Sequence, residues 1–505
     1  MARPAPRARA CRPERGADAS PGRRTFDHDP PAAVALGSRD SPRSPLPSMR
    51  LHRRVLVAAL ALPLLHSRDG PVGAEQLSRV TTGDGRILSA RKFLDGLGVN
   101  AHVSWPGHYP YSQTGKVIAA LDYLGVRKLR DYINSSTLPV FERLAASGVR
   151  LNLLLNPKVG LDNYLGWARS LARNHPGSVA ALEGPNEVDK WPVTFGRLEG
   201  FAAAVATQRA LYAGAKSDPV LAKAPVYNLT ISGISRSKSA ALGDLSAHAD
   251  YANVHPYYRA GQQSWGHSLR DTRYTLKNYL ASARWTAPGR PVVLTETGST
   301  TAVGSAIGVS EEIQARQILN SLMAAAAHQV AATYIYELVD SHDAGPQDVE
   351  SHYGLYRYDW TPKPAAMALH NLTRILGRGR GARAPRASPA PEYMLTGMPA
   401  AGRSLLFRLD DGTYAIVLWA EPDLWNEDAS VPIAAPTVTA HIAFSAVQPS
   451  VLVYDPLVSD RPLRSLGPTR RLGVPVSDHP LIVQVSRAPA SGGAYPGAVT
   501  APPAS

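Results

Sequence analysis

The feature that most constrains the fold is an alternation of short apolar runs with longer segments of helical period, which starts near Val99 and occurs eight times. This alternation is typical of βα units around a parallel sheet. The runs expected to be strands cover residues 99–105, 126–131, 149–155, 180–184, 226–233, 251–255, 292–295 and 331–336. The expected helices cover residues 116–124, 138–147, 164–173, 196–216, 272–283, 311–328 and 365–376.

Eight βα units predict an α/β fold of the (β/α)8 TIM barrel type over residues 98–376, because such barrels need roughly 250 residues. The alternative is a doubly wound open sheet, which usually carries a glycine-rich first turn that binds a pyrophosphate. The turn after the first expected strand instead reads Trp105-Pro106-Gly107. The sequence therefore favours the barrel.

The pattern of apolar residues changes after the predicted barrel. Residues 377–390 are rich in Gly, Arg, Ala and Pro and predict a linker. Beyond them, short runs of period two predict a smaller all-β sandwich domain over residues 391–487, to which the segment 75–97 is a candidate extra strand. Residues 488–505 are mostly Ala, Gly, Pro and Ser and predict a disordered tail.

The N-terminal region predicts export. Residues 1–48 are rich in Pro, Arg and Ala without periodicity, so we expect them to be untranslated or disordered, with Met49 as the start. Residues 49–74 run from a basic stretch through an apolar run to Val72-Gly73-Ala74, as a secretory signal peptide does. We therefore expect a secreted or periplasmic protein, the alternative being a buried helix. The one cysteine, Cys11, lies upstream of the expected cleavage site.

The net charge of +14 is a weak indication of a nucleic-acid partner. Much of the charge precedes residue 75, and the remainder is dispersed without a basic helix or a basic–aromatic motif. No apolar run reaches the roughly 18 residues that span a bilayer. We expect no nucleic-acid partner and no membrane span, and the sequence leaves the oligomeric state open.

Two carboxylates follow the fourth and seventh expected strands: Glu187, after Asn186, and Glu296. Barrel enzymes carry their chemistry at the C-terminal ends of strands, and strands four and seven face each other across the barrel. Cleavage of a glycoside with retention needs a carboxylic acid and a carboxylate nucleophile about 5–5.5 Å apart. We predict Glu187 as acid/base and Glu296 as nucleophile, although each short motif alone also fits a helix cap.

These residues resemble the signature of clan A glycoside hydrolases. In that clan the Asn before the acid/base holds the sugar 2-hydroxyl, which implies this role for Asn186. His255-Pro256-Tyr257 resembles the clan's His-x-Tyr, so the resemblance implies that Tyr257 hydrogen-bonds the nucleophile, with His255 beside it. Arg130, at the end of the second strand, lies where a supporting Arg is common, although pairing with a nearby Asp is an alternative.

The resemblance is closest to families 5, 39 and 79, which have a run similar to residues 353–364 before the last helix; families 39 and 79 also carry a β-sandwich. Two departures leave the substrate open. The common Pro after the acid/base is Val188 here, and the eighth strand ends in Tyr336-Glu337 where Trp is usual.

Further aromatic and polar residues at strand ends are candidates for a sugar subsite, with core packing as the alternative. They are His102, Trp105, Tyr336 and Glu337, together with Trp191 and Trp265. A metal site built from His102, His255, His342 and His352 is the rival hypothesis. No tight ligand spacing supports it, so we expect no metal and no cofactor.

The sequence thus predicts a retaining O-glycoside hydrolase acting on a β-linked poly- or oligosaccharide by double displacement. Two alternatives remain open: a transglycosidase with the same pair, and a non-catalytic carbohydrate-binding or polysaccharide-assembly protein.

Overall fold

The computed structural model describes residues 86–105, 107–258, 260–265, 274–379, 389–399 and 401–486. The expectations for residues 1–48, the signal peptide at 49–74, Cys11 and the tail at 488–505 lie outside these ranges, as does most of the expected linker.

A parallel sheet of eight strands forms the first domain. In spatial order the strands are β8 (Val226–Tyr227), β5 (Val179–Glu183), β4 (Arg150–Leu154), β3 (Lys128–Tyr132), β2 (Leu97–Asn100), β11 (Thr333–Ile335), β10 (Val292–Thr297) and β9 (Ala252–Val254). An isolated parallel bridge between Tyr227 and Tyr251 joins the two ends of this order. The predicted (β/α)8 barrel is confirmed.

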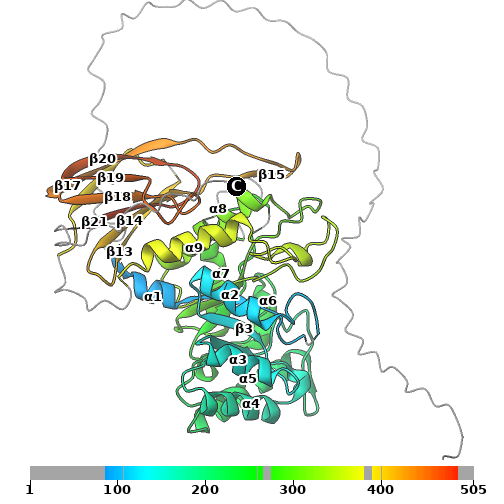
Figure 1. Cartoon of the computed structure of the whole chain (residues 1–505). Coiled ribbons are helices and arrows are strands. Elements are labelled where there is room, and N and C mark those ends of the chain that lie inside the picture. Colours follow the sequence, from blue (N-terminus) through cyan, green and yellow to red (C-terminus); the bar gives the residue numbers. More distant parts are fainter. Residues whose placement is uncertain are drawn as a thin grey trace, which may run out of the picture. The chain divides into compact units, whose positions relative to one another are not determined.

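A helix follows each barrel strand, and the helices lie outside the sheet (Figure 1). They are α2 (Thr114–Leu124), α3 (Leu138–Ala146), α4 (Leu161–Asn174), α5 (Gly200–Ser217), α6 (Arg236–Leu242), α7 (Leu276–Thr286), α8 (Glu311–Ala327) and α9 (Pro364–Leu376). Local sequence sets their ends: the Ser310 side chain caps α8, and the left-handed Gly125 ends α2. Helix α6 was not expected, because seven residues are too few for a recognisable helical period.

The first barrel strand differs from its prediction. We expected residues 99–105, whereas β2 spans Leu97–Asn100 and the chain then leaves the sheet. His102 and Trp105 therefore lie in the following loop, where the Trp105 amide donates to the His102 carbonyl at 3.0 Å. The fifth strand is also shorter than the expected 226–233, because the chain pairs in the sheet only at Val226–Tyr227.

The second domain is the predicted β-sandwich. Its larger sheet has the order β1 (Ile87–Ser89), β13 (Gly402–Arg408), β14 (Tyr414–Ala420), β21 (Leu481–Ser486), β18 (Ser450–Tyr454) and β19 (Arg464–Leu466). The smaller sheet has the order β12 (Tyr393–Thr396), β17 (Val438–Gln448) and β20 (Thr469–Val476). Side chains from both sheets share one hydrophobic cluster, so the sheets pack face to face.

The remaining elements are short. They are α1 (Ala90–Asp95), the two-residue pairs β6 (Thr194–Phe195) with β7 (Leu198–Glu199) and β15 (Trp425–Asn426) with β16 (Val431–Pro432), and the 3-10 turns Pro157–Val159, Ser246–His248 and Glu350–His352.

The larger sheet is apolar on both faces. On β14, Ile416 and Leu418 point into the sandwich, while Val417 and Trp419 belong to the cluster that includes buried residues of α8 and α9. The two-residue period of the strand thus fills both cores.

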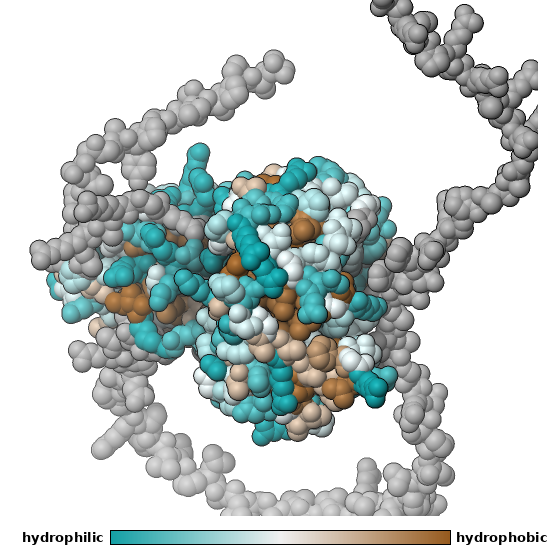
Figure 2. Space-filling model, turned by 90° about the horizontal axis from the view of Figure 1, so that it is seen from below, coloured by the Kyte–Doolittle hydropathy of each residue, from teal (hydrophilic) through white to brown (hydrophobic). Residues whose placement is uncertain are grey.

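The face of the molecule in Figure 2 mixes hydrophilic and hydrophobic residues. Within the described ranges, no helix combines the length and the apolarity needed to cross a bilayer.

Candidate active site

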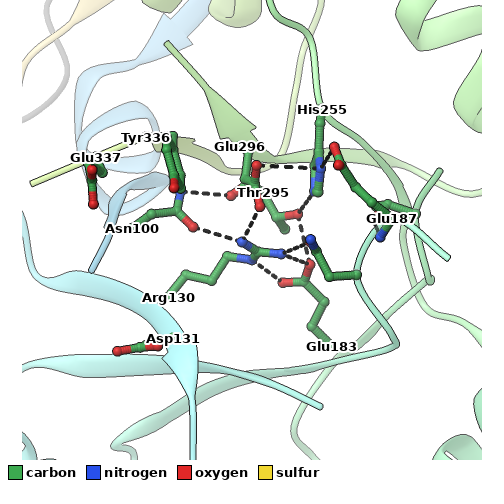
Figure 3. A network of polar contacts seen from close by, with 12 residues as sticks. Asn100, Arg130, Asp131, Glu183, Glu187, His255, Thr295, Glu296, Tyr336 and Glu337 are labelled. Atoms are coloured by element: carbon green, nitrogen blue, oxygen red, sulfur yellow. Dashed lines mark hydrogen bonds and ion pairs between the residues drawn. The ribbon is translucent and has the colours of Figure 1, made fainter. Parts of the chain in front are cut away.

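The site is organised around Arg130 on β3, whose side chain is 3% exposed (Figure 3). Its Nε and Nη2 donate to the two oxygens of Glu183 at 2.9 and 2.8 Å, and its Nη1 donates to Glu296 Oε1 at 2.6 Å. It also donates to the side-chain oxygens of Asn100 and Asn186, both at 2.8 Å. Burial alone lowers the pKa of Arg130, but Glu183 and Glu296 outweigh it and raise this pKa. Arg130 is therefore a permanent cation with every direction of its guanidinium used.

Glu183, the last residue of β5, is the buried counter-ion of Arg130, and sequence reasoning did not select it. Besides Arg130 it accepts hydrogen bonds from Asn152 Nδ2 at 2.6 Å and Asn253 Nδ2 at 3.1 Å. Burial raises the pKa of Glu183. The Arg130 guanidinium has the opposite effect, and the net result is a lowered pKa. The available signal was one carboxylate in the otherwise apolar strand Val-Ala-Ala-Leu-Glu.

Glu296 lies on β10 and is held by two donors. Arg130 Nη1 donates to one carboxylate oxygen, and the Tyr257 hydroxyl donates to the other at 2.8 Å. The Glu296 side chain is 10% exposed, so a small molecule in the barrel mouth can reach it. Both donors stabilise a negative charge on Glu296 without covering it.

Glu187 lies in the loop after β5, with a positive φ of 36° that is uncommon for a residue other than glycine. Thr230, after β8, fixes this backbone: its hydroxyl accepts from the Glu187 amide at 2.9 Å. The carboxylate contacts His255 Nδ1 at 3.1 Å and Lys190 Nζ at 2.8 Å. Strain of this kind persists where the surroundings fix it, and it is frequent at functional sites.

The two candidate carboxylates approach each other closely. Ligating atoms of Glu187, His255 and Glu296 all lie within 4.8 Å of one another. The loop after β5 and the strand β10 therefore bring the two predicted residues to one place. The two carboxylates are thus close enough to contact one small bound group.

His255 and Glu187 share a proton, as the partners of His255 show. The Nε2 atom of His255 lies 2.9 Å from the Thr295 hydroxyl, whose one hydrogen is taken by Glu183 or Asn253. Thr295 must accept from Nε2, so Nε2 carries a hydrogen. The contact between Nδ1 and Glu187 then holds one further proton, on either the imidazole or the carboxyl group.

The charges around Glu187 favour its ionised form in the empty site. Burial raises the pKa of Glu187, but the His255 ring and the Lys190 ammonium more than offset it and bring this pKa to about 2. Glu187 is therefore ionised at rest, and its use as an acid requires it to gain a proton.

A second group of predicted residues lies beside Glu187 and Glu296. His102 stacks on Trp105 with ring centroids 4.0 Å apart, and its Nε2 lies 3.1 Å from Glu337 Oε2 and 3.3 Å from the Tyr336 hydroxyl. Tyr111, which the sequence did not single out, donates to Glu337 at 2.8 Å. Glu337 is completely buried, and its contact with Nε2 orients the His102 ring.

The two remaining aromatic candidates lie in different parts of the protein. Trp191 is 49% exposed in the loop that carries Glu187. Trp265 instead contacts the sandwich: its amide donates to Glu421 at 3.0 Å, and Arg403 lies over its ring. Trp265 is thus outside the site.

The described residues contain one group with metal-ligand geometry, the three side chains Glu187, His255 and Glu296. Both carboxylates of this group are already paired with cations, because Arg130 binds Glu296 and Lys190 binds Glu187. A divalent ion would face both positive charges at short range. The donor set therefore fits a proton-transfer site better than a metal centre.

No protein-family model and no curated protein matches the chain. Solved structures do match. A family 39 glycoside hydrolase from Bacteroides cellulosilyticus WH2 has a TM-score of 0.55 and 12% identity, over 79% of this chain and 82% of that one. A monomeric beta-xylosidase from Caulobacter crescentus CB15 has a TM-score of 0.50 and 13% identity, over 78% and 96%. The resemblance to clan A barrels is confirmed at the level of the fold.

Proposed function

We propose that the chain is a retaining O-glycoside hydrolase that cleaves a β-linked oligo- or polysaccharide. The observation that carries this proposal is the placement of Glu187 and Glu296 after the fourth and on the seventh barrel strand, with ligating atoms within 4.8 Å. Inverting enzymes keep their carboxyl groups roughly 6.5–9.5 Å apart to admit a water molecule. The β configuration rests on the clan A resemblance.

In the first step, Glu296 attacks the anomeric carbon while Glu187 gives its proton to the glycosidic oxygen, and the carbon–oxygen bond to the leaving sugar breaks. Arg130 and Tyr257 hydrogen-bond the two oxygens of Glu296 and hold it aligned for attack. Asn186 has its side-chain oxygen fixed by Arg130, which leaves its amide group free to donate to a sugar hydroxyl. The product is a covalent glycosyl ester of Glu296.

In the second step, Glu187 takes a proton from water, whose oxygen attacks the same carbon and releases Glu296. The two displacements together retain the configuration. His255 supplies a reservoir for the shared proton between the steps. His102, Trp105 and Tyr336 are placed to hold the remainder of the sugar, with Glu337 beneath them.

Product stereochemistry tests the proposal. Wild-type protein is screened on 4-nitrophenyl β-glycosides, beginning with the β-xyloside because one structural neighbour is called a beta-xylosidase. Proton NMR of the best substrate should show the β-anomer first. First appearance of the α-anomer would overturn the retaining mechanism.

The acid/base assignment has a separate test. Glu187→Ala should lose activity on a poor leaving group, and added azide should restore turnover as the β-glycosyl azide. Unchanged turnover by Glu187→Gln would contradict the assignment, whereas binding of carbohydrate without any turnover by the wild-type protein would favour a barrel that only binds carbohydrate.

We also propose that the protein is exported, on the strength of residues 49–74. N-terminal sequencing of protein collected outside the cytoplasm should begin at Glu75. An intact Met1 or Met49 terminus on that protein would contradict cleavage.

A further inference from the structure

Lys190 is the accessible cation beside the catalytic pair. Its side chain is 58% exposed and its ammonium lies 2.8 Å from Glu187 Oε2. By contrast, Arg130 is 3% exposed and His255 is completely buried, and both are engaged with buried groups. Of these three basic groups, Lys190 is the one that a substrate can reach.

The contact between Lys190 and Glu187 conflicts with acid catalysis. His255 occupies one oxygen of Glu187 and Lys190 the other, so both favour the ionised carboxylate. Proton transfer to a glycosidic oxygen needs the neutral carboxyl group. Withdrawal of the ammonium would favour movement of the shared proton from His255 to Glu187.

A neutral sugar hydroxyl competes poorly for Lys190, because a hydrogen bond between an ammonium and a carboxylate is roughly twice as strong as one between neutral groups. An anionic substituent on the substrate competes on equal terms. Glu187 must contact the leaving oxygen, so Lys190 borders the leaving sugar rather than the sugar attacked by Glu296.

One neighbour of Lys190 fits such a sugar. Trp191 is adjacent to Lys190 and offers an exposed indole face on which a pyranose ring can stack. Glu350, an exposed carboxylate in the turn Glu350–His352, contributes with Glu187 and Glu296 to the negative potential that raises the pKa of Lys190.

We infer that Lys190 is a specificity-determining residue for a leaving sugar that carries a carboxylate, as a uronic acid does, and that pairing with this carboxylate frees Glu187 to act as the acid. The inference rests on the proposed retaining mechanism. The groups that face Glu187 are then His255, Lys190, Glu296 and Glu350, and Lys190 is the one whose contact the substrate changes.

The test uses two β-glycosides of the sugar that the wild-type protein prefers, one with a 3-carboxyphenyl and one with a 3-carbamoylphenyl leaving group. Wild type should favour the carboxylate in kcat/KM by about tenfold. Lys190→Met should abolish this preference. Lys190→Arg, which keeps the charge, and Lys158→Met, which removes an exposed lysine elsewhere, should preserve it. A preference that persists in Lys190→Met, or is absent in wild type, overturns the inference.

A second measurement does not depend on turnover. Carbon-13 NMR of labelled glutamate carboxyls, with Glu187 assigned from Glu187→Gln, should show a higher pKa for Glu187 in Lys190→Met than in wild type. An unchanged pKa overturns the inference. Trapping of wild-type Glu296 by a 2-fluoro glycoside distinguishes the two failures: a trapped enzyme without leaving-group preference keeps the mechanism and rejects the role of Lys190.

Discussion

At the scale of single residues, the site depends most on Arg130, because one buried guanidinium donates hydrogen bonds to Glu296, Asn186 and Glu183 together. A lysine at this position keeps the charge but has no planar set of five donors. Arg130→Lys should therefore lower kcat/KM by about 100-fold on an aryl glycoside, with circular dichroism confirming the fold.

Removal of the Arg130 charge should also destabilise the protein. Arg130→Met leaves Glu183 as an unpaired buried anion, which costs about 3–5 kcal/mol of unfolding free energy. Urea unfolding measures this loss, and the double variant with Glu183→Gln should recover part of it. A loss below about 1 kcal/mol in Arg130→Met would contradict the buried ion pair.

A substitution at Tyr257 tests a single hydrogen bond to Glu296. Tyr257→Phe removes only the hydroxyl that donates to Glu296, while the Tyr257 carbonyl still accepts from Tyr279. The lost charged hydrogen bond should lower kcat by about tenfold or more with little change in unfolding free energy. Equal kcat values for Tyr257→Phe and wild type would show that this contact does not act on the reaction.

The sequence identified the site residues at the strand ends more completely than the groups that contact them. Glu187, Glu296, Asn186, Arg130, His255 and Tyr257 were selected as strand-end residues, and the structure brings them together. Lys190 was missed although it pairs with Glu187 from three residues further along the same loop. Glu183 and Thr230 were missed because their roles depend on which strands are neighbours. Those neighbours are fixed by barrel closure, which no local pattern reveals.

At the scale of elements, β2 shows why strand limits were harder to predict. Its Gly98 lies against the ring of Tyr334 on β11, where an added Cβ would come within 2.2 Å of ring atoms. A glycine inside a strand weakens the local strand signal, so the run after it was taken for the strand. Strands of two residues such as β8 carry no recognisable period at all.

The same contact gives a stability prediction. Gly98→Ala should destabilise the barrel by about 1–3 kcal/mol, because the methyl group overlaps Tyr334. Gly115→Ala is the matched control, since Gly115 lies in α2 with nothing within 4 Å of an added Cβ, and should be neutral or stabilising. Equal melting temperatures for the two variants would argue against the close packing of β2 on β11.

At the scale of the whole molecule, a charged cluster joins barrel and sandwich. His479 Nδ1 lies 2.7 Å from Asp478 Oδ1 and Nε2 lies 3.1 Å from Asp455 Oδ2, while Asp478 also pairs with Arg316 of α8 at 3.0 Å. Burial lowers the pKa of His479, but the two carboxylates raise it to about 9. Arg316 and Asp478 thus join the barrel to the sandwich, and a histidine that is charged at neutral pH supports Asp478 from the sandwich side.

The sign of the pH dependence follows. The folded-state pKa of His479 lies above its ordinary 6.5, so its contribution is complete below pH 6.5 and is lost as the pH rises to about 9. Unfolding free energy should fall by roughly 1–3 kcal/mol over this range. His479→Gln should show a flatter profile, and a wild-type profile as flat as that of the variant would contradict the cluster.

The central claim is that Glu296 forms a covalent glycosyl ester within reach of Glu187. Incubation of the wild-type protein with the matching 2,4-dinitrophenyl 2-deoxy-2-fluoro-β-glycoside should increase the intact mass by one fluoroglycosyl group. Peptide mapping should place the group on Glu296, and Glu296→Gln should remain unlabelled. A label on another residue, or no label on a protein that hydrolyses the parent glycoside, would contradict the proposed mechanism.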